Sequence, residues 1–160
     1  MTDYSHERAR PSIPQCKRAT ASITFDGKHL MLKGKGSQLF PAVSGRRDAK
    51  LGFVYTVERQ KASKEGPIPA GEYWINFQEL WENAWYKRGS ARAWGNYRLT
   101  LHVFPGTETY GRGGFFIHGG AVPGSAGCID LTTHVDRFVA ELRAQMNGAD
   151  ECFIPVTVRY

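Results

Sequence analysis

From residue 22 onward the sequence alternates short runs of strand-forming residues with strong turn signals, which limits the chain to a fold built mainly from β-strands. Residues 22–25 alternate polar and apolar side chains, Asp26-Gly27 is a strong hairpin signal, and residues 28–33 return as a second strand. Glycine accounts for 18 of the 160 residues, a content that indicates many turns and few long helices. We therefore expect a β-rich fold that begins with a β-hairpin.

Several later segments are also expected to be strands. They are rich in strand-forming residues and comprise residues 51–57, 72–77, 97–104, 113–118 and 153–158. Pro155 argues for a sheet edge or a bulge in the last of them, because proline cannot donate to a sheet ladder. The sequence GPIPAG at 66–71 predicts a rigid turn that aims the strand after it.

One segment has a helical period, and it predicts an α-helix over about residues 133–147. Its apolar residues recur at helical spacing: Val135, Phe138, Val139, Leu142 and Met146. We expect Thr133 to cap the start of this helix, with Asp136 three residues on, and Gly148 to close it.

The segment 79–95 is rich in aromatic residues that lie among polar ones. They are Trp81, Trp85, Tyr86 and Trp94. This mixture fits either a short helix near residues 79–88 followed by a loop or an aromatic wall of a cleft. Trp81 and Trp85 are candidate substrate-binding residues in the second case.

The chain has the size of one domain. Its 160 residues, 17.9 kDa in mass, suffice to bury a hydrophobic core without help from disulfides or metals. Residues 1–20 lack a hydrophobic period and are expected to form a flexible or loosely docked arm, followed by a single domain over residues 21–160. No segment has the length of a membrane span, and the polar N-terminus lacks the apolar core of a signal peptide. We therefore expect cytoplasmic synthesis, without a recognisable export signal and without stable membrane insertion.

The net charge of +6 and the pI near 9.4 raise the question of nucleic-acid binding. The basic residues are scattered, however, and no known nucleic-acid-binding motif surrounds them. A moderate positive charge is equally suited to an anionic cell envelope. We therefore expect no nucleic-acid partner.

The three cysteines, Cys16, Cys128 and Cys152, are odd in number and widely spaced, so at least one thiol stays unpaired within the chain. No Cys-x-x-Cys pair indicates a zinc site or a redox dithiol. Cys16 lies in the polar arm and Cys152 just before the last strand, and neither has the surroundings of a reactive thiol.

The segment 115–131 (FFIHGGAVPGSAGCIDL) brings a histidine and Cys128 together. His118 ends a buried strand, and the loop 121–124 can fold back so that Cys128 returns to the same place. A thiol attacks as the thiolate and usually needs a neighbouring imidazole. We therefore predict Cys128 as a nucleophile and His118 as its base. Three other histidines are weaker candidates: His29, His102 and His134.

Small residues around Cys128 allow a substrate carbonyl group to approach the backbone closely. The expected donors to the oxyanion of a tetrahedral intermediate are three N–H groups, those of Ala126, Gly127 and Cys128. A carbonyl group in the Gly119 stretch is expected to hold the His118 ring, and Ser125 to support the loop. The opposing interpretation makes Cys128 and His118 ordinary core residues. Six glycines between residues 113 and 127 argue against it.

Two blocks, 118–119 (HG) and 125–129 (SAGCI), resemble the signature of the L,D-transpeptidase (YkuD-like) superfamily, in which His-Gly is followed by Ser-x-Gly-Cys and a hydrophobic residue. The chain is more closely similar to the short YkuD-related family of type VI secretion effectors that attack peptidoglycan. That resemblance rests on three further blocks: 25–27 (FDG), 44–45 (SG) and 66–73 (GPIPAGEY). It covers roughly residues 22–158.

The sequence departs from the wider superfamily at two positions. Ala126 stands where a second histidine is usual, and Asp130 stands where Arg or Asn is usual. The stretch between His118 and Ser125 is also shorter than in housekeeping transpeptidases. These departures favour the effector branch over the crosslinking enzymes.

The resemblance implies a YkuD-like β-sandwich catalytic domain that requires no metal or organic cofactor. Cys128 would attack the carbonyl group of the third-position meso-diaminopimelate in peptidoglycan tetrapeptide stems and expel the terminal D-Ala. Water would then give L,D-carboxypeptidase activity, whereas a free D-amino acid would give exchange. Tyr110 and Asp130 join the two tryptophans as candidate substrate-binding residues.

The resemblance further implies an antibacterial type VI secretion effector that acts in the periplasm of a target bacterium. Its expected partners are peptidoglycan stem peptides, the secretion machinery and a cognate immunity protein. A housekeeping or phage-borne L,D-transpeptidase and a catalytically inactive cell-wall-binding module are the alternatives. A papain-like endopeptidase is disfavoured, because such enzymes place Cys before His in the chain.

Overall fold

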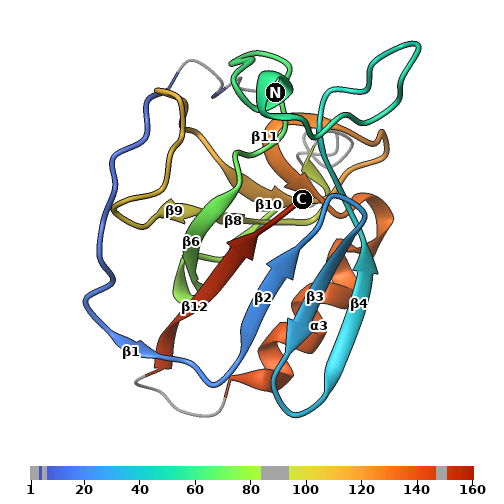
Figure 1. Cartoon of the computed structure of the whole chain (residues 1–160). Coiled ribbons are helices and arrows are strands. Elements are labelled where there is room, and N and C mark those ends of the chain that lie inside the picture. Colours follow the sequence, from blue (N-terminus) through green and yellow to red (C-terminus); the bar gives the residue numbers. More distant parts are fainter. Residues whose placement is uncertain (1–3, 5–6, 84–93, 147–150) are drawn as a thin grey trace.

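The computed structural model describes residues 4, 7–83, 94–146 and 151–160, and the strands in this part of the chain form two mixed sheets (Figure 1). The elements are, in chain order, β1 (Lys17–Arg18), β2 (Ser22–Phe25), β3 (His29–Lys33), β4 (Ser37–Pro41), β5 (Val43–Gly45), α1 (Val57–Gln60), β6 (Gly71–Asn76), η1 (Phe77–Glu79), β7 (Trp81–Glu82), β8 (Tyr97–Thr100), β9 (His102–Val103), β10 (Phe116–His118), β11 (Ser125–Asp130), η2 (Thr132–His134), α3 (Val135–Gln145) and β12 (Glu151–Val158). The elements η1 and η2 are short 3₁₀ helices.

The first sheet has the strand order β4-β3-β2-β12-β6-β9, with β1 also paired to β12, and the second has the order β5-β11-β10-β8-β7. Apolar side chains from both sheets form one buried core. A mainly β fold with one principal helix in its C-terminal region is therefore confirmed. None of the helices in the described ranges is long and apolar enough to cross a membrane.

The expected hairpin is present as β2 and β3, which pair in antiparallel fashion. The Asp26 carboxylate accepts hydrogen bonds from the N–H groups of Lys28 and His29, at 2.8 and 2.7 Å. Gly27 adopts a φ of 90°, and a Cβ atom there would collide with the Tyr55 ring. Turn chemistry and close packing therefore both require glycine at this position.

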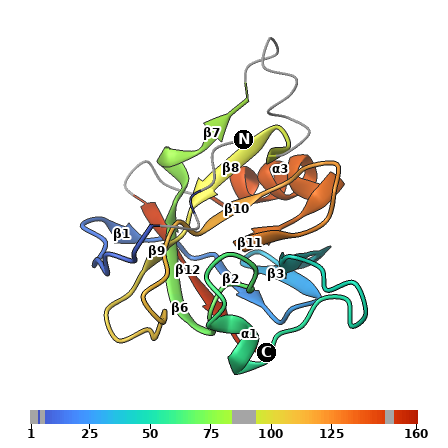
Figure 2. The same ribbon diagram turned by 90° about the horizontal axis from the view of Figure 1, so that it is seen from above.

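The expected helix is α3, which packs against both sheets (Figure 2). The ring of Phe138 meets that of Phe40 on β4 edge-on, with ring centroids 5.5 Å apart. On the other side, Phe138 lines a small gap together with Leu99 of β8 and Ile117 of β10. The helix thereby holds the back of β10, the strand that carries His118.

Two details of the expected elements are wrong. Residue 134, not Thr133, caps α3, and the cap makes no side-chain hydrogen bond. Pro155 does not lie at a sheet edge, because β12 runs between β2 and β6. The ladder between β12 and β2 begins at Val156, directly after the proline, so the missing N–H group falls before the paired stretch.

Two other segments also differ from the expectation. Residues 51–56 form a loop rather than a strand, and α1 begins directly after them at Val57. The loop starts at a turn in which the Asp48 carboxylate accepts the N–H group of Lys50 at 2.8 Å. The segment 79–88 begins with the end of η1 and continues as β7, not as a helix. Residues 84–88 lie outside the described residues.

The described part of the N-terminal arm lies along the domain and is joined to it at several points. Its backbone donates hydrogen bonds from Ala9 to Arg112 O at 3.0 Å and from Ser12 to Val103 O at 2.8 Å. Further along the arm, β1 pairs with β12, and a disulfide joins the arm to the start of that strand. The cysteines of this disulfide are Cys16 and Cys152.

Candidate active site

The two predicted catalytic residues lie on neighbouring parallel strands. In the register of β10 and β11, His118 is opposite Asp130 and Ile117 is opposite Ile129. Because Ile117 and Ile129 face the core, strand alternation puts Cys128, Asp130 and His118 on the other face of the sheet. Cys128 is the free cysteine of the described chain, and its side chain and that of His118 are 3% and 1% exposed.

One nitrogen of the His118 ring is held by the backbone. Nδ1 lies 2.6 Å from the carbonyl oxygen of Gly119, so Nδ1 carries a proton and donates it there. Nε2 is buried and makes no hydrogen bond of good geometry with the described residues. The Cys128 thiol is nevertheless close enough to this ring to interact with it. A histidine held in this tautomer presents its basic nitrogen to the thiol.

The electrostatic environment of His118 favours the imidazolium. Burial alone would lower the pKa of His118, but the adjacent Cys128 and the charge of Asp130, with the Gly119 carbonyl, raise it above its ordinary value. The Trp94 ring meets the imidazole edge-on at 4.8 Å and closes one side of it. The site is therefore suited to a thiolate–imidazolium pair.

Asp130 is a buried carboxylate that holds the loop between His118 and Cys128. It is 1% exposed and accepts the N–H groups of Gly124 and Thr132 at 2.9 and 2.8 Å. Burial raises the pKa of Asp130, while the charge of His118 and the two N–H donors act in the opposite direction. In this structure its oxygens serve the backbone, so its contribution to the site is to position the loop and His118.

Two glycines of the site leave little room for a side chain. A Cβ atom on Gly119 would collide with Val135 of α3. Gly127 has a φ of 72°, and its Cβ atom would lie 3.0 Å from the Phe115 ring and 3.3 Å from a nitrogen of Arg112. The backbone next to His118 and Cys128 is therefore packed closely against its neighbours.

The amide groups expected to form an oxyanion hole are not equivalent. The N–H group of Gly127 donates to the carbonyl oxygen of Gly66 at 2.9 Å and is already engaged. Residues 126–128 fall in an irregularity of β11, between the pairs Ser125–Gly45 and Ile129–Ser44. Irregularities of this kind re-aim backbone groups beside active sites. The N–H groups of Ala126 and Cys128 are therefore the better candidates.

Arg112 is part of the site although the sequence interpretation missed it. Its side chain is 3% exposed, and its Nη atoms donate to three carbonyl groups: those of Gln60 and Pro67, both at 2.6 Å, and Gly66, at 3.0 Å. Burial lowers the pKa of Arg112, whereas the neighbouring Tyr73, Tyr160 and Cys128 raise it. The only signal in the sequence is a lone arginine next to the glycines that precede β10. The guanidinium ties the 66–71 turn to the nucleophile segment.

Aromatic side chains gather on the same face of the second sheet, beside His118. They surround the guanidinium of Arg98, which lies 4.6 Å from the ring of Trp81, 4.9 Å from Trp94, 5.4 Å from Phe116 and 5.8 Å from Tyr4. We call these five residues the Arg98 cluster. Of the substrate-binding candidates, Trp81 belongs to this cluster and Trp85 lies outside the described residues. Tyr110 is elsewhere, with its ring 5.7 Å from Nζ of Lys61.

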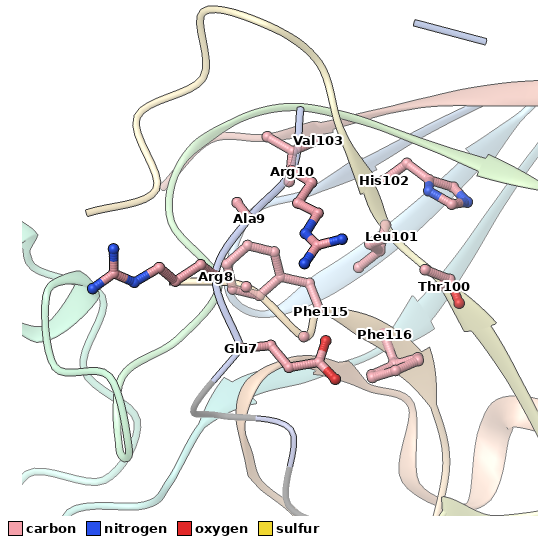
Figure 3. A pocket seen from close by; sticks show the side chains of 12 residues that line it. Glu7, Arg8, Ala9, Arg10, Thr100, Leu101, His102, Val103, Phe115 and Phe116 are labelled. Carbon is pink, nitrogen blue, oxygen red and sulfur yellow. The ribbon is translucent and has the colours of Figure 1, made fainter. Parts of the chain in front are cut away.

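A groove adjoins the Arg98 cluster between the N-terminal arm and strands β8 to β10. Figure 3 shows Glu7 and Arg10 on the arm side of this groove and Thr100 and Phe116 on the sheet side. Phe116 belongs to both the groove and the cluster. The arm thus supplies one wall of this groove.

The weaker histidine candidates lie apart from Cys128 in their described contacts. Nε2 of His102 lies 2.7 Å from a carboxylate oxygen of Glu79, and the ring stacks on Trp74 with centroids 4.1 Å apart. His134 stands at the start of α3, and His29 is an exposed residue at the start of β3. His118 is the histidine whose ring interacts with the Cys128 thiol.

A family model of the Tlde1 domain matches residues 40–152. The chain belongs to the Tlde1 domain family. Members of this family are type VI secretion effectors related to L,D-transpeptidases, so the expected family is confirmed. The matched range includes the 66–71 turn and the whole of β10 and β11, while the arm lies before it. No curated protein shows a significant match to the chain.

Asp130→Asn is expected to change the pH dependence of this Tlde1 domain. The substitution removes a charge that raises the pKa of His118, so the imidazolium should be lost at lower pH and the alkaline limb of turnover should move to lower pH. NMR titration of the His118 ring, together with a pH–rate profile, measures the shift. Asp136→Asn is the matched control, because that carboxylate accepts hydrogen bonds from the exposed side chain of Asn96. An unchanged His118 titration in Asp130→Asn would contradict the role given to Asp130.

Proposed function

We propose that this Tlde1 domain modifies peptidoglycan through an acyl-enzyme on Cys128. It removes the terminal D-Ala from tetrapeptide stems, exchanges it for another D-amino acid, or does both. The observation that carries the proposal is the buried His118, whose Nδ1 is committed to the Gly119 carbonyl. Its remaining nitrogen has no hydrogen-bond partner of good geometry among the described residues and adjoins the one free thiol there.

In the first half-reaction, Nε2 of His118 accepts the thiol proton, and the sulfur of Cys128 attacks the carbonyl carbon of diaminopimelate. The tetrahedral intermediate collapses as the C–N bond breaks, and the imidazolium returns the proton to the leaving D-Ala amine. In the second half-reaction, the thioester is attacked by water to give a tripeptide stem, or by the amine of a D-amino acid to give a new tetrapeptide.

The negative oxygen of each tetrahedral intermediate needs fixed donors. The N–H groups of Ala126 and Cys128 are the proposed donors, since that of Gly127 is already engaged with Gly66. The buried positive charge of Arg112 adds to the field at Cys128. It does so from behind the nucleophile, because its nitrogens are bound to carbonyl groups of the 66–71 turn.

Membership of a type VI effector family supports secretion into target cells. We propose that its site of action is the target's periplasm, where the stem peptides lie. A cognate immunity protein would protect the producing cell and its kin. The removal or exchange of terminal D-Ala would deprive the target cell of donor stems for crosslinking.

Purified tetrapeptide muropeptides provide the direct test. Incubation with the protein should release D-Ala and leave a tripeptide, and addition of D-Met should yield a product with D-Met in place of D-Ala. Mass analysis distinguishes the two outcomes and measures their ratio. An unchanged tetrapeptide under both conditions, with binding to intact sacculi, would contradict the proposal and support a non-catalytic cell-wall-binding module.

A further inference from the structure

Arg98 stands directly beside the catalytic histidine. In the antiparallel register of β8 and β10, Arg98 is the residue opposite His118. Side chains opposite each other in such a pair project from the same face, with Cβ atoms about 4.5–5.5 Å apart. Its guanidinium is therefore one side-chain length from the reacting atoms.

The guanidinium of Arg98 is oriented by aromatic rings and not by an acid. Trp81 and Trp94 lie within 5 Å of it, and no carboxylate of the described residues forms an ion pair with it. Contacts of this kind use the faces of the guanidinium and leave its N–H edge available. The side chain is only partly buried, so a ligand can reach that edge.

The proposed reaction requires a way to recognise the end of a peptide. A carboxypeptidase must distinguish a terminal residue from an internal one, and the terminal carboxylate is the group that differs. This carboxylate is separated from the scissile carbonyl group by a single residue, a distance on the order of 3.8 Å between successive Cα atoms. The group that binds it must therefore adjoin the catalytic pair.

Two arginines of the described chain adjoin this pair, and only one of them is available. Arg112 is 3% exposed and its Nη atoms are bound to three carbonyl groups. Arg98 has a partly exposed guanidinium on the face that carries His118. A planar guanidinium donates two parallel hydrogen bonds to a carboxylate, which fixes the position as well as the charge of the ligand.

We infer that Arg98 binds the terminal carboxylate of the stem peptide and sets the specificity for a C-terminal D-amino acid. Trp81 and Trp94 hold the guanidinium in place for this contact. The inference rests on the proposed function and deepens it, because it assigns the residue that restricts the reaction to peptide ends.

The test compares two substrates with two proteins. Arg98→Ala should lower kcat/KM for the free-acid tetrapeptide by about 10- to 100-fold, mainly through KM, because a charge-assisted hydrogen-bond pair is lost. A tetrapeptide that ends in D-alaninamide should show a similar loss with the unmodified protein. Arg98→Ala should cause no further loss on the amide, because both changes remove the same interaction. Arg98→Lys should be intermediate, since it keeps the charge but not the fork.

Arg137→Ala is the matched control, since that guanidinium belongs to α3 and lies 4.4 Å from the Phe40 ring. Its kcat/KM should be unchanged. The alkylation rate of Cys128 by iodoacetamide should also be the same in Arg98→Ala as in the unmodified protein, which shows an intact catalytic pair. The inference would be overturned if the losses in kcat/KM caused by Arg98→Ala and by the terminal amide multiplied when the two changes are combined. A slower alkylation of Cys128 would also overturn it. A third contrary result would come from a stem amidated on its diaminopimelate side chain instead of its terminus, if Arg98→Ala caused no further loss in kcat/KM on that substrate.

Failure of the inference and failure of the proposed function give different results. If the unmodified protein releases no D-Ala from the free-acid tetrapeptide, the proposed reaction is wrong. If it releases D-Ala but the losses in kcat/KM from Arg98→Ala and from the terminal amide multiply, only the assignment of Arg98 is wrong.

Discussion

Cys128→Ala is expected to abolish D-Ala release and exchange, with turnover reduced by about 10⁴-fold or more, because the proposed acyl-enzyme forms on the sulfur that this substitution removes. The substitution changes little else, since the side chain is 3% exposed and alanine keeps its Cβ atom in place. Turnover of purified muropeptides measures the effect. The same variant directed to the periplasm of a susceptible bacterium should no longer be toxic.

The controls for Cys128→Ala separate chemistry from folding. Cys128→Ser keeps the shape of the side chain and supplies a much weaker nucleophile, so it should be almost as inactive. Both variants should unfold cooperatively near the midpoint temperature of the unmodified protein. Full toxicity of a folded Cys128→Ala protein would mean that the catalytic account is wrong and that wall binding alone is harmful.

The hairpin, the principal helix and the nearness of His118 and Cys128 could be predicted because their determinants are local. Asp26-Gly27 prescribes a turn within four residues, and the apolar period of residues 135–146 prescribes one buried face. The nearness of His118 and Cys128 follows from a strand end and a short return loop. These are all patterns within about a dozen residues.

The remaining features depend on contacts between distant parts of the chain. Cys16 and Cys152 are 136 residues apart, and nothing near either of them indicates that they pair. The N–H group of Gly127 is taken by the 66–71 turn, a partner that strand periodicity cannot identify. Arg112 is buried against the same turn, contrary to the usual exposure of a lone arginine. Each of these features appears only when the two sheets have been assembled.

Residues 51–57 show how a local pattern can mislead. The segment contains strand-forming residues, but Asp48 accepts two N–H groups at its start and closes a turn. Leu51 is then left 75% exposed. The turn chemistry of one aspartate outweighs the β-propensity of the residues after it, and the sheets formed by the described residues do not include this segment.

Loss of the His118 ring is expected to cause the second large decrease in turnover. The second histidine that is usual before Gly-Cys is Ala126 here, so His118 has no substitute within the nucleophile segment. His118→Ala is therefore expected to lower turnover by about 10²- to 10⁴-fold, since it removes both the base and the cation that pairs with the thiolate. Muropeptide turnover measures the loss, and iodoacetamide labelling should show that Cys128 reacts more slowly at neutral pH.

His102→Ala is the matched control for His118→Ala, because His102 is paired with Glu79 and stacked on Trp74 on a different sheet. Its turnover should stay near that of the unmodified protein, even where its stability falls. If His118→Ala instead kept most of its turnover, the base would have to come from His102 or His134. Comparing the turnover of His102→Ala with that of His134→Ala would identify which of the two it is. We expect the large loss in His118→Ala because Nδ1 of His118 is fixed by the Gly119 carbonyl group. Within that ring, Nε2 is then the only nitrogen that can accept the thiol proton.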